Sequence, residues 1–307
     1  MTGSNDFRVT LLGTGTPIPR HERFGPSTLV QAGEQTLLID AGRGATIRLY
    51  QLGVPMGRVD ALLLTHYHSD HTVGIPDFWL TGWLHSYYAR RTRPLRVIGP
   101  TGAKTLMTNL ERAYALDIKI RVADEKLPPD GVALAVEEFN ADGVVYDKGG
   151  VKVIAFEVDH GEVIKPAYGY RIEYGGRSVV HSSDTRYNEN VVKHGAGADL
   201  LIHEVAIARP ELMSEAYIQR IMAHHTTARE AGMVFARTRP KLAAYTHLVF
   251  LANERVPAAT LADLVAETRQ TYDGPLEVGE DLMSFEIGEV VTVRRFGMQA
   301  KPEPAGG

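Results

Sequence analysis

The sequence predicts a single layered α/β domain, with two β-sheets at its centre and helices on the outside. The chain has 307 residues, of which 44% are hydrophobic and 23% charged, an ordinary composition for a globular protein. Short apolar runs typical of strands precede stretches with helical spacing, and this order occurs twice. No linker-like stretch and no short repeat divides the chain, so residues 1–298 are expected to form one domain and residues 299–307 a flexible tail.

The first cluster of expected strands lies within the first hundred residues. Each is a short apolar run bounded by Gly, Pro, Asp or Thr, which is typical of a buried strand. We expect these strands at Phe7–Leu12, Ser27–Gln31, Gln35–Ile39, Ala61–Leu64 and Arg96–Gly99. Gly33-Glu34 is expected to form a hairpin turn between the second and third of them. Helical spacing of apolar residues predicts helices at Thr46–Leu52, Ile75–Ala89 and Thr101–Ala115.

A second cluster of strands and helices follows in the same order. Its strands are expected at Ala133–Glu138, Val151–Val158, Tyr168–Tyr174, Ser178–His181 and Leu200–His203. Gly175-Gly176 is the expected hairpin turn between the third and fourth of these. Two helices are expected to complete the second layer, at Thr226–Arg237 and Ala258–Tyr272.

Composition and charge exclude several classes of protein. No apolar run approaches the ~20 residues of a membrane helix, and Met1–Arg8 is too polar for a signal peptide, so we expect a cytoplasmic protein. The net charge of −4, the pI of about 6.3 and the lack of a dense Lys/Arg stripe argue against a nucleic-acid partner. The chain has no cysteine, so any metal ligands must be His, Asp or Glu.

The segment 65–71 holds four possible metal ligands in succession. His66 and His68 leave an expected strand on an extended loop, where alternate side chains point the same way. Asp70 and His71 fall at the following turn, so this one loop can supply ligands to two adjacent cations. Imidazole and carboxylate suit zinc, iron or manganese. A polar surface loop is the alternative, but this density of ligand types favours a metal site.

The pattern His66-x-His68-x-Asp70-His71 after an apolar strand resembles the signature of the metallo-β-lactamase superfamily. The resemblance spans about residues 7–290 and implies an αββα four-layer sandwich. It also implies three distant ligands, each following a strand, which match His160, Asp184 and His247. One metal would then take His66, His68 and His160, the other would take Asp70, His71 and His247, and Asp184 would bridge them. His at position 68 favours two zinc ions, with Mn²⁺ or Fe²⁺ as alternatives.

Four further segments resemble the tRNase Z and arylsulfatase branch of this superfamily. They are Leu12-Gly13-Thr14-Gly15-Thr16-Pro17, Ser183-Asp184-Thr185-Arg186, His203-Glu204-Val205 and His225-Thr226-Thr227-Ala228. In that branch the last His protonates the leaving group and the Glu orients it, roles that fall on His225 and Glu204. His224 is an alternative proton donor, although the Thr-Thr-Ala that follows favours His225. Asp70 is expected to orient the attacking hydroxide as well as to bind metal.

One departure from the tRNase Z pattern decides the expected function. Members of that group carry a long basic arm that grips tRNA, whereas here only 23 residues, 161–183, separate the corresponding ligands. The only spare sequence, residues 117–150, is acidic and would repel phosphates. We therefore expect a dizinc hydrolase of a small ester-type substrate, arylsulfatase- or phosphodiesterase-like, that binds no nucleic acid. Because the family often dimerises, a homodimer is also expected.

Three other functions stay open on the sequence. A lactonase or other carboxylic ester or amide hydrolase would use the same site. A tRNA 3′-end endonuclease is disfavoured by the missing arm. A non-catalytic ligand-binding module would keep the fold without the chemistry, but the complete ligand set argues against it.

Two sets of residues near the candidate ligands have a functional and a structural interpretation. Asp40, at the end of an expected strand, can accept the free N–H of a ligand histidine, or it can simply form a turn. Trp79 and Trp83 on the helix that follows the metal loop, with Phe250 opposite, can form an apolar wall for an aromatic or apolar substrate group. Their i, i+4 spacing is equally typical of a helix face packed in the core.

Overall fold

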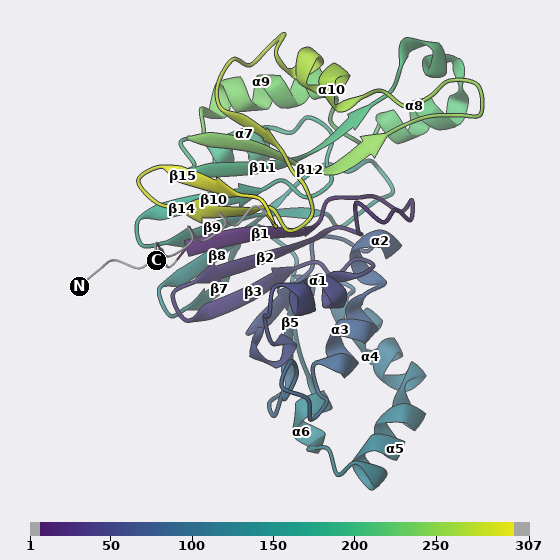
Figure 1. Cartoon of the computed structure of the whole chain (residues 1–307), viewed down its shortest axis with the longest axis vertical. Helices are drawn as coiled ribbons and strands as arrows, with labels where there is room; N and C mark the ends of the chain where they lie inside the picture. Colours follow the sequence, from purple (N-terminus) through teal and green to yellow (C-terminus); the bar gives the residue numbers. More distant parts are fainter. Residues whose placement is uncertain (1–6, 298–307) are drawn as a thin grey trace, which may run out of the picture.

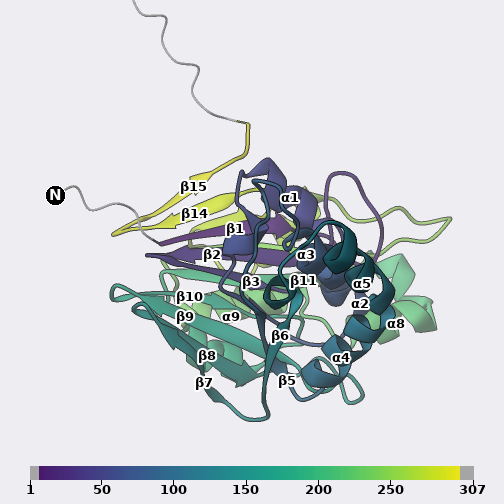
Figure 2. The ribbon, with the colours of Figure 1, turned by 90° about the horizontal axis from the view of Figure 1, so that it is seen from below.

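In the computed structural model, which describes residues 7–297, two β-sheets pack face to face and helices cover both outer faces (Figure 1). Seen from below, the two sheets lie as separate layers (Figure 2). The predicted fold class, an αββα sandwich, is therefore confirmed. The expected tail at 299–307 lies outside the described residues.

Within the described range, the first sheet has eight strands in the order β15-β14-β1-β2-β3-β4-β5-β6. In chain order these are β1 (Phe7–Gly13), β2 (Ser27–Ala32), β3 (Gln35–Ile39), β4 (Ala61–Leu63), β5 (Leu95–Pro100), β6 (Leu134–Phe139), β14 (Ser284–Ile287) and β15 (Val291–Arg294). The predicted hairpin joins β2 to β3, with Ala32 opposite Gln35. Strands β3 to β6 run parallel, so their carboxyl ends meet at one edge of the sheet.

The second sheet has seven strands over the same range, in the order β13-β12-β11-β10-β9-β8-β7. In chain order these are β7 (Gly143–Lys148), β8 (Val151–Glu157), β9 (Tyr168–Tyr174), β10 (Arg177–His181), β11 (Leu200–Ile207), β12 (Leu242–Phe250) and β13 (Leu276–Val278). Strands β10 to β13 run parallel, and β7 to β10 form antiparallel hairpins. The predicted turn at Gly175-Gly176 joins β9 to β10.

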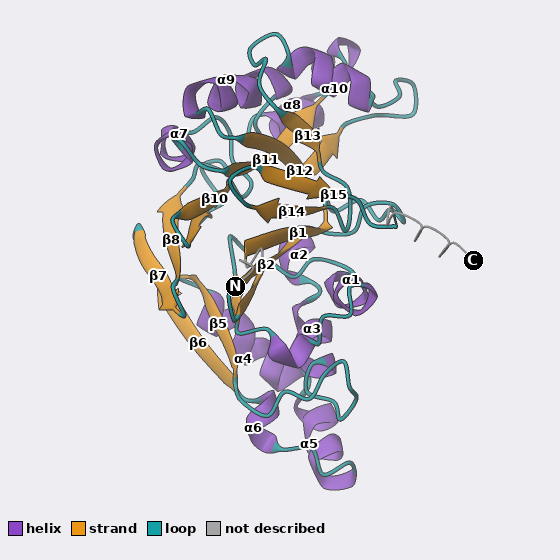
Figure 3. Ribbon diagram, turned by 60° about the vertical axis from the view of Figure 1, so that its left-hand side comes forward, coloured by secondary structure: helices purple, strands orange, loops and turns teal. Residues whose placement is uncertain are grey.

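Helices lie on either side of this sandwich (Figure 3). The first sheet is covered by α1 (Ala45–Gln51), α3 (Ile75–Thr81) and α4 (Ala103–Ala113), and the second by α7 (Glu189–Gly195), α9 (Ala228–Thr238) and α10 (Leu261–Thr268). Four shorter or peripheral helices are α2 (Ser69–Thr72), α5 (Ala115–Asp124), α6 (Pro129–Val132) and α8 (Ala216–Met222). Over residues 7–297, no helix combines the length and apolar character that crossing a bilayer requires.

The alternation of side chains along the strands divides the core into layers. On β3, Leu37 points between the two sheets, whereas its neighbour Leu38 points outward beneath the helices. On β11, Ile202 faces between the sheets and Leu201 faces α9 in the same way. All four side chains are fully buried, and each such burial stabilises the fold by about 1.5–3 kcal/mol.

The helix predicted over Ile75–Ala89 is shorter in the structure and ends at Thr81. The chain turns at Gly82, where a Cβ would lie 2.6 Å from the guanidinium of Arg91. That buried guanidinium donates a hydrogen bond to the carbonyl of Gly131 at 2.9 Å and another to a carbonyl of α3. Arg91 thus fills the space beside Gly82, at the point where the helix has ended.

Several elements were not predicted from the sequence. The helix expected over Thr101–Ala115 is α4, which starts after Gly102, whose φ is 116°. Helix α5, which follows it and continues to Asp124, had no prediction. Strands β7, β14 and β15 and helix α8 had no prediction. β7 and β15 expose alternate residues at the margin of a sheet, which weakens the apolar signal on which strand prediction depends.

Candidate metal centre

The loop after β4 brings four candidate ligands to the edge where the two sheets meet. The chain is extended through His68, with φ −62° and ψ 145°, and then turns into the short helix α2. Asp70 and His71 project from that helix, and both are buried together with His66. The loop packs closely against Gly42, where any Cβ would collide with the carbonyl oxygen of Asp70.

The second sheet supplies three more candidates from three different strands. His160 follows β8, and Asp184 follows β10 after Ser183, whose φ is 61°. His247 lies within β12 rather than after it, at a register shift against β11, and has a φ of 44°. This β-bulge turns the His247 side chain toward the site. Left-handed backbone at His247 and at Ser183, the residue before Asp184, is strain of the kind that concentrates at functional sites.

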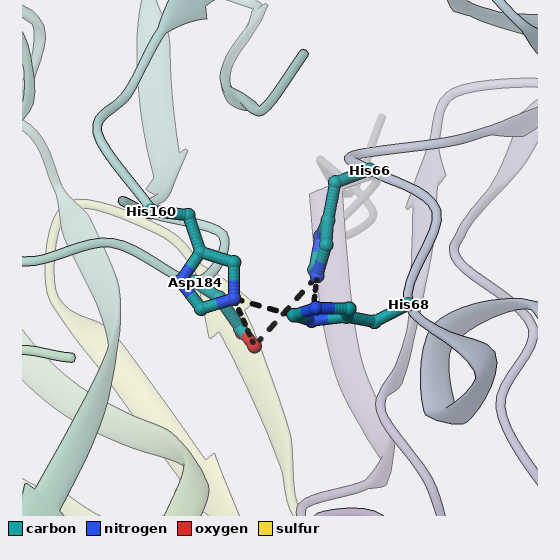
Figure 4. A group of neighbouring side chains, drawn as sticks. All are labelled: His66, His68, His160 and Asp184. Atoms are coloured by element: carbon teal, nitrogen blue, oxygen red, sulfur yellow. Dashed lines mark hydrogen bonds and ion pairs between the residues drawn. The ribbon is translucent and has the colours of Figure 1, made fainter. Parts of the chain in front are cut away.

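The first group of donor atoms consists of three imidazoles and one carboxylate (Figure 4). His68 Nδ1 lies 3.1 Å from His66 Nε2 and 3.2 Å from His160 Nε2. Asp184 Oδ2 lies 3.9 Å from His66 Nε2 and 3.8 Å from His160 Nε2. Donors at zinc–ligand distance from one tetrahedral ion lie roughly 3.3–3.5 Å apart, so the spacing fits a single cation.

A second group adjoins the first through Asp184. His247 Nε2 lies 3.3 Å from Asp70 Oδ2, and His71 Nε2 lies 3.7 Å from the same oxygen. Asp184 Oδ2 is 3.2 Å from each of these two imidazole nitrogens. A single carboxylate oxygen therefore lies within 3.9 Å of four imidazoles from both groups.

The outer hydrogen bonds of the imidazoles indicate that the inner nitrogens carry lone pairs. His71 Nδ1 lies 2.7 Å from Asp40 Oδ2, and His160 Nδ1 lies 2.8 Å from the carbonyl oxygen of His224. A carboxylate and a carbonyl only accept, so both Nδ1 atoms must carry the proton. In the neutral form of each ring the Nε2 lone pair then faces the other donors, His68 Nδ1 in the case of His160 and Asp184 Oδ2 in the case of His71, which is the orientation that a metal ligand needs. The donor set thus fits metal binding.

Asp40 connects two of the candidate ligands. It is buried and accepts hydrogen bonds from the backbone N–H of Thr65 at 2.9 Å, the Thr65 hydroxyl at 2.7 Å and His71. The Thr65 hydroxyl oxygen lies 3.0 Å from His66 Nδ1, so Asp40 also reaches that ligand indirectly. Such contacts fix the orientation of metal-binding imidazoles. Sequence reasoning missed Thr65, although its place beside His66 was a usable signal.

Glu204 and His225 form a buried pair beside the second group. His225 Nδ1 lies 3.2 Å from Glu204 Oε2, and the other carboxylate oxygen accepts the backbone N–H groups of Thr226 and Thr185. Burial, with the nearby charge of Asp184, raises the pKa of Glu204 well above its usual value. Burial lowers the pKa of His225 to about 4, although Asp184 acts in the opposite direction.

His224 occupies a different position from its neighbour. Its ring stacks on that of His160, with centroids 5.1 Å apart and planes at 20°, and no hydrogen bond joins it to Glu204. The following residues begin α9, where Thr227 is the N-cap in a capping box with Glu230. This cap fixes where the segment that carries His224 and His225 ends and the helix begins.

The structure contradicts the predicted apolar wall of Trp79 and Trp83. Both indoles are at most 1% exposed, in the core beneath the helices of the first sheet. Their N–H groups donate to the carbonyl oxygens of Val132 and Pro128, at 2.8 Å each, so they point toward α6. Their i, i+4 spacing marks a core stripe. Phe250 instead lines a cavity that includes Leu248, the residue after a candidate ligand.

Residues 35–248 match the family described as the Beta-lactamase superfamily domain. The match covers the histidine-rich loop, both later strand-end ligands and the bulge that carries His247. Together with the two groups of donor atoms, it defines a metal-dependent hydrolase. The predicted enzyme class and the expectation of a metal cofactor are confirmed at this level.

Comparison with individual proteins identifies the branch. A protein named Ribonuclease Z from Mycolicibacterium gilvum is 37% identical over 297 residues, covering 95% of this chain and all of that relative. The metallo-β-lactamase fold protein YhfI from Bacillus subtilis, with a TM-score of 0.70 and 21% identity, covers 91% of this chain and 98% of its own. Human tRNase Z, short form, has a TM-score of 0.68 and 22% identity, with coverages of 92% and 99%. The chain belongs to the metallo-β-lactamase superfamily and, within it, to the tRNase Z branch.

These relatives overturn two expectations drawn from the sequence. A small ester-type substrate of arylsulfatase or phosphodiesterase type was expected, and a nucleic-acid partner was not, yet relatives of this identity are named for action on RNA. The error came from taking the missing arm, with only residues 161–183 in its place, and the charge of the whole chain as measures of what the active edge can bind. There, Arg20 and Arg43 are exposed, and Arg43 directly follows the Gly42 that contacts the metal loop.

Proposed function

We propose that this protein is an endoribonuclease that removes the 3′ trailer from precursor tRNA. The observation that carries the proposal is the 37% identity to a ribonuclease Z over 95% of this chain and the whole of that relative. Agreement over the full length of both chains supports a shared substrate better than the fold alone does. A tRNA substrate would also agree with the cytoplasmic location expected from the sequence.

We further propose zinc as the metal, since three or more imidazoles with carboxylates form a common zinc ligand set. The ligands would be His66, His68 and His160 at one position, Asp70, His71 and His247 at the other, and Asp184 between them. Bound divalent cations supply activation of water and neutralisation of the charge that develops on a phosphodiester.

The protein's own side chains would handle the protons of the reaction. Asp70 Oδ2, 3.3 Å from His247 Nε2, can accept a proton from an attacking water as well as hold it in line. Glu204 Oε2 would accept the Nδ1 proton of His225, so the ring must carry a second proton on Nε2 before it can donate one to the departing oxygen of the RNA, and the negative charge that develops on that oxygen favours this cationic form. In this assignment His225 is the general acid and Glu204 its positioning residue.

The metal site would be more open to RNA than in an enzyme that carries a long arm between the corresponding ligands. Between His160 and Asp184 the chain forms only a loop and the hairpin of β9 and β10. The exposed cations beside the metal loop, Arg20 and Arg43, can contact phosphates where the strand enters.

The test is cleavage of a precursor tRNA that carries a short 3′ trailer. Zinc-loaded protein should release the trailer in one cut next to the mature 3′ end, mapped by the length of the labelled fragments. Asp184→Ala, which removes the oxygen shared by both groups of donors, should lose at least one metal ion and nearly all cleavage. Asp199→Asn is a matched control, because this buried carboxylate binds Ser178 and Lys241 at the opposite end of the strands. Fully metal-loaded wild-type protein that leaves the precursor intact would refute the proposal.

A further inference from the structure

A single carboxylate near the C-terminal end closes the loop that follows β1. This loop, residues 14–24, contains the Gly-Thr-Pro segment that the sequence singled out, and of its residues only Arg20 has a role in the proposed function. Asp281, whose side chain is only 4% exposed, lies at its base. The two ends of the loop are already joined by a hydrogen bond from Gly15 N–H to the carbonyl of Phe24, at 2.8 Å.

Asp281 accepts five hydrogen bonds from three residues. Its Oδ1 accepts the backbone N–H and the hydroxyl of Thr14, both at 2.9 Å. Its Oδ2 accepts the backbone N–H of Phe24 at 2.7 Å and two guanidinium N–H groups of Arg48, at 2.8 and 3.2 Å. The carboxylate therefore holds the first and last residues of the loop together and anchors them to α1.

Two arginines complete this closure. Arg48 also lies over the ring of Phe24, 4.0 Å from its centroid, so it packs against the end of the loop that Asp281 binds. Arg23 donates to the Thr14 hydroxyl at 2.7 Å and to the carbonyl of Gly279 at 2.6 Å. The base of the loop is thus rigid, whereas the residues from Pro17 to Glu22 at its tip are exposed.

The loop borders the metal edge on the side of β12. Thr14 accepts the backbone N–H of Leu248, the residue after the candidate ligand His247, at 3.0 Å. Between the loop and the end of β12 lies a cavity of about 210 Å³, lined by Thr16, Arg20 and Arg23 on the loop and by Leu248 and Phe250 on the strand. Arginine beside an aromatic ring is a common combination for contacting a phosphate and an unstacked base.

We propose that Asp281 is the positioning residue that holds the 14–24 loop in place to contact the single-stranded RNA next to the scissile bond. This inference rests on the proposed function, because it requires that the ligand of the loop is the RNA strand that enters the metal site. Asp281 lies in the turn before β14 and its hydrogen bonds go to Thr14, Phe24 and Arg48, none of them a candidate metal ligand, so it would act through the two ends of the loop.

Asp281→Asn tests the proposal with little change of volume. One amide oxygen can still accept from Thr14, but the NH₂ group would then face the donors of Phe24 and Arg48, and those bonds are lost. Zinc-loaded variant should bind two metals as the wild type does and keep kcat within about threefold. KM for precursor tRNA should rise roughly ten- to hundredfold, the worth of one or two hydrogen bonds to a charged group. Asp199→Asn, a buried carboxylate away from the loop, should leave KM unchanged.

Hydrogen–deuterium exchange provides a second readout that does not depend on activity. In Asp281→Asn, amides of residues 14–24 should exchange faster while those of residues 66–71 stay protected. Unchanged exchange, or unchanged KM in an active variant, would overturn the positioning role. Loss of metal or an equal fall in kcat would show that Asp281 supports the metal edge instead. A wild-type protein that leaves precursor tRNA uncut would refute the proposed function and the RNA contact, while the exchange data would still decide on the closure of the loop.

Discussion

Glu204 and His225 show how one residue limits the chemistry of another. The carboxylate is fully buried and receives two backbone N–H groups on Oε1, which leaves Oε2 for the imidazole. With Nδ1 engaged, proton exchange with a substrate can take place only at Nε2 of His225. The adjacent His224 has no such partner, so the two neighbouring histidines are not equivalent.

His225→Ala should reduce precursor cleavage by ~10²–10⁴-fold, the usual contribution of general acid catalysis. Metal content should stay at the wild-type level, because His225 lies outside the assigned ligands. His224→Ala is the matched control: it removes the stacked ring but keeps the backbone carbonyl that His160 binds, so cleavage should fall less than tenfold. Single-turnover rates with metal analysis decide between them, and the reverse order would make His224 the donor.

Asp40→Asn should weaken metal binding without emptying the site. Asp40 Oδ2 now accepts hydrogen bonds from His71 and from the Thr65 hydroxyl. An amide NH₂ group at that position would face these two donors with a third donor, and the hydrogen bonds would be lost. Replacing such a partner of a ligand histidine usually costs 10–100-fold in metal affinity. Competition with a chromophoric chelator measures this loss, with Asp199→Asn as control. Wild-type affinity in Asp40→Asn would reduce Asp40 to a turn residue.

At the level of helices and strands, sequence reasoning located elements better than their ends. Distant ligands such as His160 were assigned from the order of ligands that the family resemblance implies, and the strand expected before each of them agreed with that order. The end of α3 was missed because Arg91, ten residues beyond it in the chain, fills the space at Gly82. The packing of Trp79 and Trp83 against the α6 segment could not be predicted either. Their spacing indicates an apolar face, but it does not show which element covers that face.

Trp83→Ala should lower stability and leave substrate recognition alone. The indole is 1% exposed, and its N–H donates from the turn after α3 to the carbonyl of Pro128 just before α6, so its loss creates a cavity. Such truncations cost about 3–5 kcal/mol in unfolding free energy. Urea unfolding measures this loss, and KM for precursor tRNA should be unchanged. Tyr87→Ala is the control, because this ring is 70% exposed and its removal should cost less than about 0.5 kcal/mol.

The whole molecule explains why the site was easier to predict than the substrate. The donors come from both sheets, the loop after β4 on one and three strand positions on the other, so the site exists only when the sandwich is closed. Its ligands are recognisable in the sequence, because metal binding in a chain without cysteine restricts them to a few residue types, here His and Asp. Substrate choice instead depends on local surfaces such as the loop with Arg20. A few positive charges on such a loop do not change the sign of the net charge of the chain, which is −4.

The stability of the whole molecule should depend on pH, and one buried histidine should account for part of that dependence. His203 is buried beneath α9, and burial lowers its pKa to about 4, against 6.5 in an unfolded chain. Between these values the unfolded state binds a proton that the native state does not, so stability rises with pH in this window and is lost as pH falls from about 6.5 toward 4. Going from pH 7 to pH 5, His203 alone should account for roughly 2 kcal/mol of lost unfolding free energy.

His203→Gln keeps a donor for the carbonyl of Glu204, 2.6 Å from the present ring nitrogen, but cannot take up the proton. Its unfolding free energy should therefore change less between these pH values than that of the wild type, while metal loss on acidification affects both proteins alike. Parallel pH curves for the two proteins would show that His203 contributes nothing to the acid sensitivity of the fold.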